Sequence, residues 1–354
     1  MKIAFVNDTF LEGRGADVVI YELARRLGKK HKVYVIASEA NIKEENFEII
    51  LIKAKKLFTG NSLESAMNYF PNLRKFKKEI LKIQKKYQIE VFNVHHSALN
   101  NALKGLPRIV TWHGTPPSRN KLRIFFNRFL LRKLKKNKIT ITISDYMKNE
   151  LSLVIPEKKI KKIYNGISEE FKPKIKGYDK GYMLYVGRFE QHKRVQDLIK
   201  LSKETNFPLH LCGSGPLEKE LREYAQNIQA KKVIFLGKVP REDLIKQYQQ
   251  CSFFVSGSIW EGFGLIFIEA AACKKAAVGY KKGSIPEVIS NKKSGFVVKN
   301  FNEFKKKVKD LIKNKKLRYD MGKNALKFSK NFGWDKAAAE YEMTFREILN
   351  EETF

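Results

Sequence analysis

The chain alternates short apolar segments with amphipathic ones almost throughout. In the first half we expect strands at 2–6, 32–37, 47–52, 90–94, 108–112 and 139–143, and helices at 16–27, 63–87, 120–136 and 145–153. Strands that alternate with helices favour a parallel sheet covered on both faces. Ligands of such sheets bind beyond the carboxyl ends of the strands, so the residues that follow each strand are the first candidates for a site.

Residues 172–181 interrupt this alternation with proline, glycine and charged residues that lack apolar periodicity. They predict a linker at 171–181 between a first domain at 1–170 and a second at 182–333. In the second domain we expect strands at 182–186, 208–212, 233–236, 252–256, 276–280 and 295–298, with helices at 193–203, 215–227, 241–249 and 264–273. A chain of 354 residues is long enough for two such domains.

The most informative segment follows the apolar strand at 252–256 and reads WEGFGLIFIEAAA, residues 260–272. Gly262 and Gly264 let the backbone approach a ligand closely, and a helix that begins near Gly264 presents unpaired N–H groups suited to a phosphate. Glu261 precedes the turn, and Glu269 lies deeper, where a carboxylate can accept hydrogen bonds from paired ribose hydroxyls. The simpler interpretation is a tight strand-to-helix turn with two solvated glutamates.

The spacing of two glutamates around Gly-Phe-Gly-Leu resembles that of the family-4 retaining glycosyltransferases, also called glycosyl transferases group 1. The resemblance implies the GT-B fold: two Rossmann-like doubly wound parallel-sheet domains that face a cleft, with the helix at 334–354 crossing back to the first domain. It also implies that Glu261 and the backbone of Gly262, Phe263, Gly264 and Leu265 hold the donor sugar and its phosphates. Glu269 would hold the ribose.

Two cations open the second domain. Arg188 and Lys193 follow the strand at 182–186 and the glycine turn at Gly187. Fixed cations can stabilise the charge that develops on a leaving diphosphate without a metal, and the family's pattern places both on that diphosphate. The alternative is ordinary surface charge in a lysine-rich chain. Further along, the resemblance implies that Gly213 lies near the nucleotide and that Gly237 and Val239 lie beside the base.

The first domain is expected to present the acceptor. Residues Gly13, Arg14 and Gly15 resemble the family's early glycine pair, with Gly15 at the donor and Gly13 and Arg14 at the acceptor; Arg14 replaces a usual glycine, so which of the two acts stays open. His113 follows a strand and matches the family's cleft histidine, able to donate to a sugar hydroxyl or stabilise charge near C1; the alternative is a loop histidine with no role. His95 and His96 end the neighbouring strand and could line the acceptor pocket or have no role.

The expected reaction moves a hexose-type sugar from a nucleoside-diphosphate sugar to a glycan or lipid-linked acceptor with retention. No cofactor and no metal are expected, because neither a cluster of ligands nor an Asp-x-Asp motif is present in the sequence. His113, Glu261, Arg188 and Lys193 are the expected catalytic residues. A GT-B phosphorylase is the nearest alternative, but no lysine lies in an evident cofactor-linking context.

Net charge bears on the partners. The chain carries +33, and residues 51–150 hold 22 Lys or Arg against 5 Asp or Glu. Such charge attracts polyanions, which makes a nucleic-acid-binding protein the alternative from another class. No recognisable nucleic-acid module supports it, so no nucleic-acid partner is expected. Basic amphipathic helices at 73–87 and 122–136 instead favour contact with an anionic membrane face. Three cysteines without metal spacing favour a cytoplasmic protein.

Overall fold

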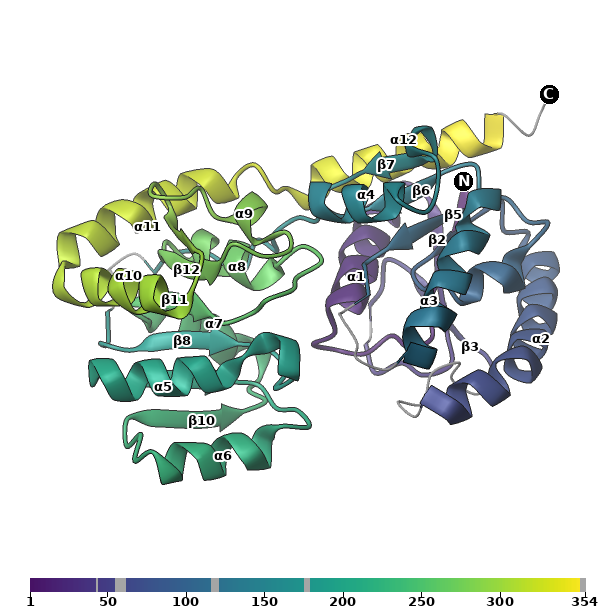
Figure 1. Cartoon of the computed structure of the whole chain (residues 1–354). Helices are drawn as coiled ribbons and strands as arrows, with labels where there is room; N and C mark the ends of the chain where they lie inside the picture. Colours follow the sequence, from purple (N-terminus) through teal and green to yellow (C-terminus); the bar gives the residue numbers. More distant parts are fainter. Residues whose placement is uncertain (43, 55–61, 116–120, 175–178, 351–354) are drawn as a thin grey trace. The chain divides into compact units, whose positions relative to one another are not determined.

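The computed structural model describes residues 1–42, 44–54, 62–115, 121–174 and 179–350. The chain forms two compact units (Figure 1). Unit 1 comprises Met1–Gly166 and Trp334–Phe354, and unit 2 comprises Ile167–Gly333. No helix in the described ranges is both long enough and apolar enough to cross a bilayer.

Unit 1 is built on a seven-stranded sheet with the order β3-β2-β1-β4-β5-β6-β7, in which every pair is parallel. The strands are β1 (Lys2–Val6), β2 (Lys32–Ala37), β3 (Glu48–Leu51), β4 (Val91–Val94), β5 (Arg108–Trp112), β6 (Thr140–Thr142) and β7 (Ile160–Lys162). The helices are α1 (Gly15–Leu27), α2 (Ser62–Tyr87), α3 (Lys121–Lys133), α4 (Asp145–Ser152) and α12 (Trp334–Asn350), with 3-10 turns η1 (Leu99–Leu103), η2 (Leu134–Lys136) and η3 (Glu157–Lys159).

Unit 2 is built on a six-stranded parallel sheet with the order β10-β9-β8-β11-β12-β13. Its strands are β8 (Met183–Val186), β9 (Leu209–Cys212), β10 (Val233–Gly237), β11 (Phe253–Ser256), β12 (Ala277–Tyr280) and β13 (Gly295–Val298). Its helices are α5 (Val195–Thr205), α6 (Glu218–Asn227), α7 (Arg241–Gln250), α8 (Leu265–Ala272), α9 (Ile285–Val288), α10 (Phe301–Lys313) and α11 (Lys315–Ser329), with the 3-10 turn η4 (Gln191–Lys193).

The apolar side chains of the strands and the covering helices form the core of each unit. In unit 2, α5 packs against both α6 and α10, and α7 packs against α8. Parallel strands buried on both faces are expected to be apolar throughout, and β11 and β12 are buried at every residue. In unit 1, the yellow helix α12 of Figure 1 packs on α1 and β5.

The segment predicted as a linker differs from expectation, because most of its described residues pack on unit 2. Phe171 is buried and contacts Tyr248 edge to face. Asp179 accepts hydrogen bonds from Ser252 and from Arg318, the latter at 2.9 Å. The chain changes units at Gly166, and residues 175–178 of the predicted linker lie outside the described residues. Proline and charge in this segment mark an irregular but attached stretch of chain.

Candidate active site

The strand order of unit 2 identifies one place where a ligand can bind. From β8 the chain proceeds outward to β9 and β10, and it then returns to the other side of β8 with β11. The segments that follow β8 and β11 therefore leave the same carboxyl edge and diverge. Open parallel sheets bind ligands at such a switch point. Arg188 and Lys193 follow β8, and Glu261 follows β11.

Lys193 and Glu261 meet at this edge. Lys193 Nζ donates to Glu261 Oε1 at 2.7 Å, and the two side chains are only 15% and 10% exposed. The backbones also join, because Ile259 N–H donates to the His192 carbonyl at 2.9 Å. Ser284 donates its hydroxyl to the Glu261 carbonyl at 3.0 Å and fixes the other side of the turn. This bond gives Ser284 a structural role beside Glu261.

Arg188 is more exposed to solvent than Lys193. Its side chain is 68% exposed and pairs with Glu190 at 3.1 Å, whereas Lys193 pairs with Glu261. The two cations predicted for the diphosphate thus come from one connection and are each matched by a different carboxylate. A ligand phosphate would have to compete with a well-shielded carboxylate at Lys193 and with a solvated one at Arg188.

Glycines at the carboxyl ends of β8, β9 and β10 take part in hydrogen bonds between neighbouring strand ends. Gly187 N–H donates to the Cys212 carbonyl at 3.0 Å, and Gly213 N–H donates to the Gly237 carbonyl at 2.7 Å. Gly213 has φ of +140°, and a Cβ there would lie 2.0 Å from the Gly187 carbonyl oxygen. Gly213 is therefore required by packing, whether or not a nucleotide lies near it. Val239, two residues beyond Gly237, is partly exposed.

Helix α8 begins directly after the glycine turn. Gly264 is its N-cap residue with φ of +93°, a conformation that costs other residues energy. Gly262 and Phe263 before it are buried, and Phe263 packs edge to face on Phe332. The helix starts at Leu265, one residue later than predicted, so its first amides lie at the same edge as Glu261.

Glu269 lies within α8 and bonds to a residue that the sequence analysis did not single out. Tyr248 of α7 donates its hydroxyl to Glu269 Oε2 at 2.7 Å, and its ring is fully buried against Phe254. Burial raises the pKa of the Glu269 carboxyl, while the Tyr248 hydrogen bond and the charge of Arg241 oppose that rise. The carboxylate is thus held in one orientation, in surroundings that penalise its charge.

Unit 1 has its own switch point, between β1 and β4. The loop after β1 is organised by Asp17, which accepts hydrogen bonds from Asn7 Nδ2 at 2.7 Å and Leu11 N–H at 2.8 Å. Burial raises the pKa of Asp17, and these bonds oppose the rise. Arg14 donates to Thr9 Oγ1 at 2.9 Å. A Cβ would meet nothing within 4 Å at Gly13 or Gly15, so packing does not account for these glycines.

Three histidines gather beyond β4 and β5. His95 Nδ1 and His113 Nε2 are 2.9 Å apart, and His96 Nδ1 accepts from Ala98 N–H at 3.3 Å. Burial lowers the pKa of His96 and of His113 to about 4, and that of His95 well below its usual value. All three imidazoles are therefore neutral at pH 7. Parallel pairing of β4 with β5 brings His113 beside His95, a closeness that sequence spacing does not reveal.

Comparisons with known proteins identify the family. The family described as glycosyl transferases group 1 matches residues 167–328, and glycosyltransferase family 4 matches residues 13–171. The chain belongs to these glycosyltransferases. The glycosyltransferase is 27% identical to the uncharacterized glycosyltransferase MJ1178 of Methanocaldococcus jannaschii over 94% of this chain and 95% of the other. It is 23% identical to N-acetyl-alpha-D-glucosaminyl L-malate synthase of Bacillus anthracis, over 96% and 95%.

Solved structures show the same fold. Sucrose-phosphate synthase from Thermosynechococcus elongatus matches with a TM-score of 0.85 at 18% identity, covering 99% of each chain. HepE from Anabaena, solved in complex with UDP-glucose, matches with a TM-score of 0.81 at 16% identity, covering 98% of this glycosyltransferase and all of HepE. The predicted GT-B fold with two Rossmann-like parallel-sheet domains is confirmed, as is the assignment as a glycosyltransferase enzyme.

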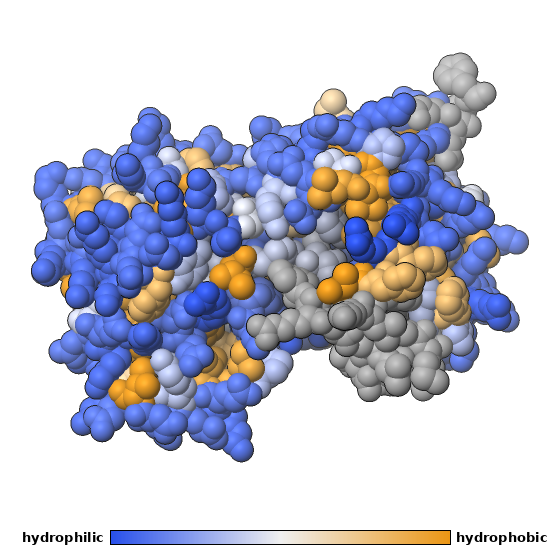
Figure 2. All heavy atoms as spheres, viewed as in Figure 1, coloured by the Kyte–Doolittle hydropathy of each residue, from blue (hydrophilic) through white to orange (hydrophobic). Residues whose placement is uncertain are grey.

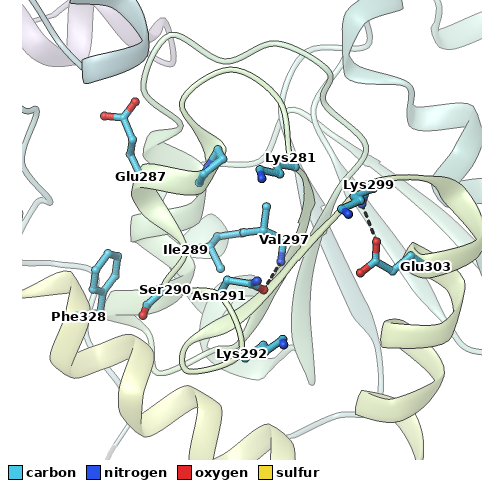
Figure 3. Close-up of a pocket in the computed structure, with 11 residues that line it drawn as sticks. Lys281, Glu287, Ile289, Ser290, Asn291, Lys292, Val297, Lys299, Glu303 and Phe328 are labelled. Carbon is cyan, nitrogen blue, oxygen red and sulfur yellow. Dashed lines mark hydrogen bonds between the residues drawn. The ribbon is translucent and has the colours of Figure 1, made fainter.

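One described cavity of the glycosyltransferase lies in unit 2, apart from the residues predicted to bind the donor. It has a volume of about 650 Å³ and is lined by residues beside β12, β13, α9 and α11, among them Lys281, Asn291 and Phe328 (Figure 3). None of the residues predicted for donor binding lines it. Within the described ranges, no group of three or more His, Cys, Asp or Glu side chains is arranged to hold a metal ion. The expected absence of a metal stays a prediction.

Proposed function

We propose that this glycosyltransferase transfers a sugar from a nucleoside-diphosphate sugar to an acceptor hydroxyl, with retention and without a metal. The observation that carries the proposal is the Lys193–Glu261 pair at the switch point of unit 2, beside the start of α8. A cation and a helix N-terminus together suit a diphosphate. The UDP and UDP-glucose complexes of HepE support a nucleotide-sugar donor for a chain of this fold.

The residues have distinct roles in this proposal. Lys193 and Arg188 bind the diphosphate, Glu261 holds the donor sugar, and Glu269 binds the ribose. The acceptor oxygen bonds to C1 as the bond from C1 to the diphosphate oxygen breaks, on the same face of the sugar. The acceptor proton moves to a phosphate oxygen of the departing nucleoside diphosphate. Lys193 and Arg188 stabilise the negative charge left on that group.

Donor binding is tested directly by a thermal-shift and hydrolysis screen across UDP-, GDP-, ADP- and TDP-sugars. We expect the nucleotide sugars of one base to raise the melting temperature of the wild-type protein and to have a much smaller effect on that of Glu269→Ala. Binding of free phosphate with no response to any nucleotide sugar would favour a phosphorylase. No response to any of these ligands would overturn the donor assignment.

We further propose that unit 1 contacts an anionic membrane face, where a lipid-linked acceptor would be found. On α3, Phe125 is 71% exposed, and Leu153 at the end of α4 is 81% exposed. Arg128, Arg132 and Lys135 line one small cavity with Leu153 and Val154. Figure 2 shows apolar and strongly hydrophilic side chains side by side over α3 and α4. Exposed apolar side chains set among cations suit a lipid surface, where each cation contributes about 1 kcal/mol.

The membrane proposal is tested by pelleting with vesicles of phosphatidylglycerol or of phosphatidylcholine. Replacing Arg128, Arg132 and Lys135 by Ser should abolish pelleting with the anionic vesicles, and Phe125→Ser should weaken it. Replacing three exposed lysines of unit 2, Lys219, Lys246 and Lys316, removes the same charge and serves as the matched control. Equal losses in both triple variants would show nonspecific attraction and overturn the proposed surface.

A further inference from the structure

Two histidine rings in unit 1 share a single hydrogen bond. His95 Nδ1 and His113 Nε2 lie 2.9 Å apart, with ring centroids at 5.1 Å. Both rings are neutral at pH 7, because burial lowers the pKa of each. A neutral imidazole has one N–H donor and one acceptor nitrogen. The bond therefore exists in one of two forms, which differ in which ring donates.

The two forms leave different groups on the far side of His95. If His113 donates, the His95 proton is on Nε2; if His95 donates, Nε2 has only a lone pair. His95 is 4% exposed, and its Nε2 has no hydrogen-bond partner among the described residues. The Phe5 ring packs beside it, with centroids 5.7 Å apart. Orphaned buried N–H groups are rarer in proteins than under-satisfied acceptors, so burial favours the form in which His95 donates.

We propose that His95 is a positioning residue that fixes His113 in the tautomer with its proton on Nδ1. Nε2 of His113 is then occupied as the acceptor from His95, and Nδ1 is left as the ring's only donor. The partner nitrogen's hydrogen bond sets the tautomer of an imidazole in this way. The consequence for chemistry rests on the proposed function and on the expected role of His113 as a catalytic residue.

Such a His113 acts as a neutral hydrogen-bond donor. It can donate to a sugar hydroxyl or to a phosphate oxygen that gains charge, and it has no free lone pair with which to accept a proton. This division of roles agrees with a mechanism in which the leaving phosphate takes the acceptor's proton. His96 has the opposite arrangement, because its Nδ1 accepts from Ala98 N–H and its proton is therefore on Nε2.

The tautomer is measured by ¹⁵N NMR of the six histidine side chains, assigned by single substitutions. In the wild-type protein we expect a protonated Nδ1 and an unprotonated Nε2 at His113. His95→Phe keeps a ring beside Phe5 but cannot donate, so His113 should shift toward the Nε2–H form. His95→Asn retains an amide donor near the position of Nδ1 and should restore the wild-type tautomer. A wild-type His113 protonated on Nε2, or one unchanged in His95→Phe, would overturn the proposal.

Activity supplies the second readout. We expect kcat to fall at least about 10-fold in His95→Phe, with little change in donor KM, and to recover largely in His95→Asn. Melting temperatures of the two variants identify any loss of folding. A protein that shows the expected tautomer but binds no nucleotide sugar would overturn the proposed function and leave the His95 assignment intact. Equal activity losses in both variants, with the tautomer unchanged, would reduce His95 to a packing residue.

Discussion

Lys193 Nζ lies 2.7 Å from Glu261 Oε1 although 68 residues separate them, and both side chains are largely shielded from water. Breaking one partner of a shielded ion pair leaves an uncompensated charge. We expect Lys193→Met to lower the free energy of unfolding by about 2–5 kcal/mol. The double variant Lys193→Met/Glu261→Gln should recover part of that loss. Urea denaturation of the wild type, Lys193→Met, Glu261→Gln and the double variant measures the coupling energy. If the double variant loses the sum of the two single losses in unfolding free energy, the ion pair itself contributes nothing.

Replacing Lys193 or Arg188 should reduce kcat to different extents, because the two cations differ in burial. Removing a group that stabilises transition-state charge in a shielded site costs about 10²–10³-fold in kcat. We expect Lys193→Met to show a loss of that order. Arg188 is 68% exposed and solvated, so Arg188→Met should cost less. Steady-state kinetics with the donor from the screen decides this, with Lys219→Met as a control far from either motif in sequence. A larger loss at Arg188 would reverse the proposed roles.

Tyr248 should affect nucleotide affinity without contacting the sugar. Its hydroxyl donates to Glu269 Oε2 at 2.7 Å, and Tyr248→Phe removes only that donor. The carboxylate then loses a bond that lowers its pKa, and its orientation is less restrained. We expect weaker binding of the nucleoside diphosphate, by at most about 10- to 100-fold, since a hydrogen bond to a charged group is worth about 1.5–3 kcal/mol and about 1.4 kcal/mol is a factor of ten. Calorimetry measures it, and unchanged affinity would mean that Glu269 does not bind the ribose.

Glu269 should also make stability depend on pH. Burial raises its folded pKa above 4.5, so the folded state holds this proton more tightly than the unfolded one. Its favourable contribution is present below pH 4.5 and is lost as pH rises through the raised value. Glu269→Gln should therefore be more stable than wild type at neutral pH, and its advantage should shrink on acidification. Thermal unfolding from pH 4 to pH 8 measures the difference; a constant difference would contradict this assignment.

The histidines of unit 1 should make stability depend on pH in the opposite direction. Their folded pKa values lie below 6.5, at about 4 for His96 and His113, so the unfolded state binds protons first. Their contribution to stability is full above pH 6.5 and falls as the pH drops toward 4. We expect His96→Asn to flatten the acid side of the stability profile. A profile identical to that of the wild type would show that His96 is accessible to protons in the folded protein.

Sequence periodicity located most elements to within a few residues, because most strands are apolar runs. It missed β7, whose three residues include Lys161 and Lys162 and contain little apolar signal. It also could not show which side chains meet. The Tyr248–Glu269 bond joins two helices, and the His95–His113 bond depends on β4 pairing with β5. The motif residues could be identified from the sequence, whereas their hydrogen-bond partners depend on packing between elements.

The helix α12 returns to unit 1 after the whole of unit 2 has been completed. Its Tyr341 hydroxyl lies 3.1 Å from Thr111 Oγ1 of β5, its Asp335 pairs with Arg26 of α1, and Phe345 packs on Phe5. During synthesis unit 2 therefore has every residue it needs before unit 1 does. The half of the protein translated first is the half finished last, and one flank of its sheet remains uncovered until residues 334–350 leave the ribosome.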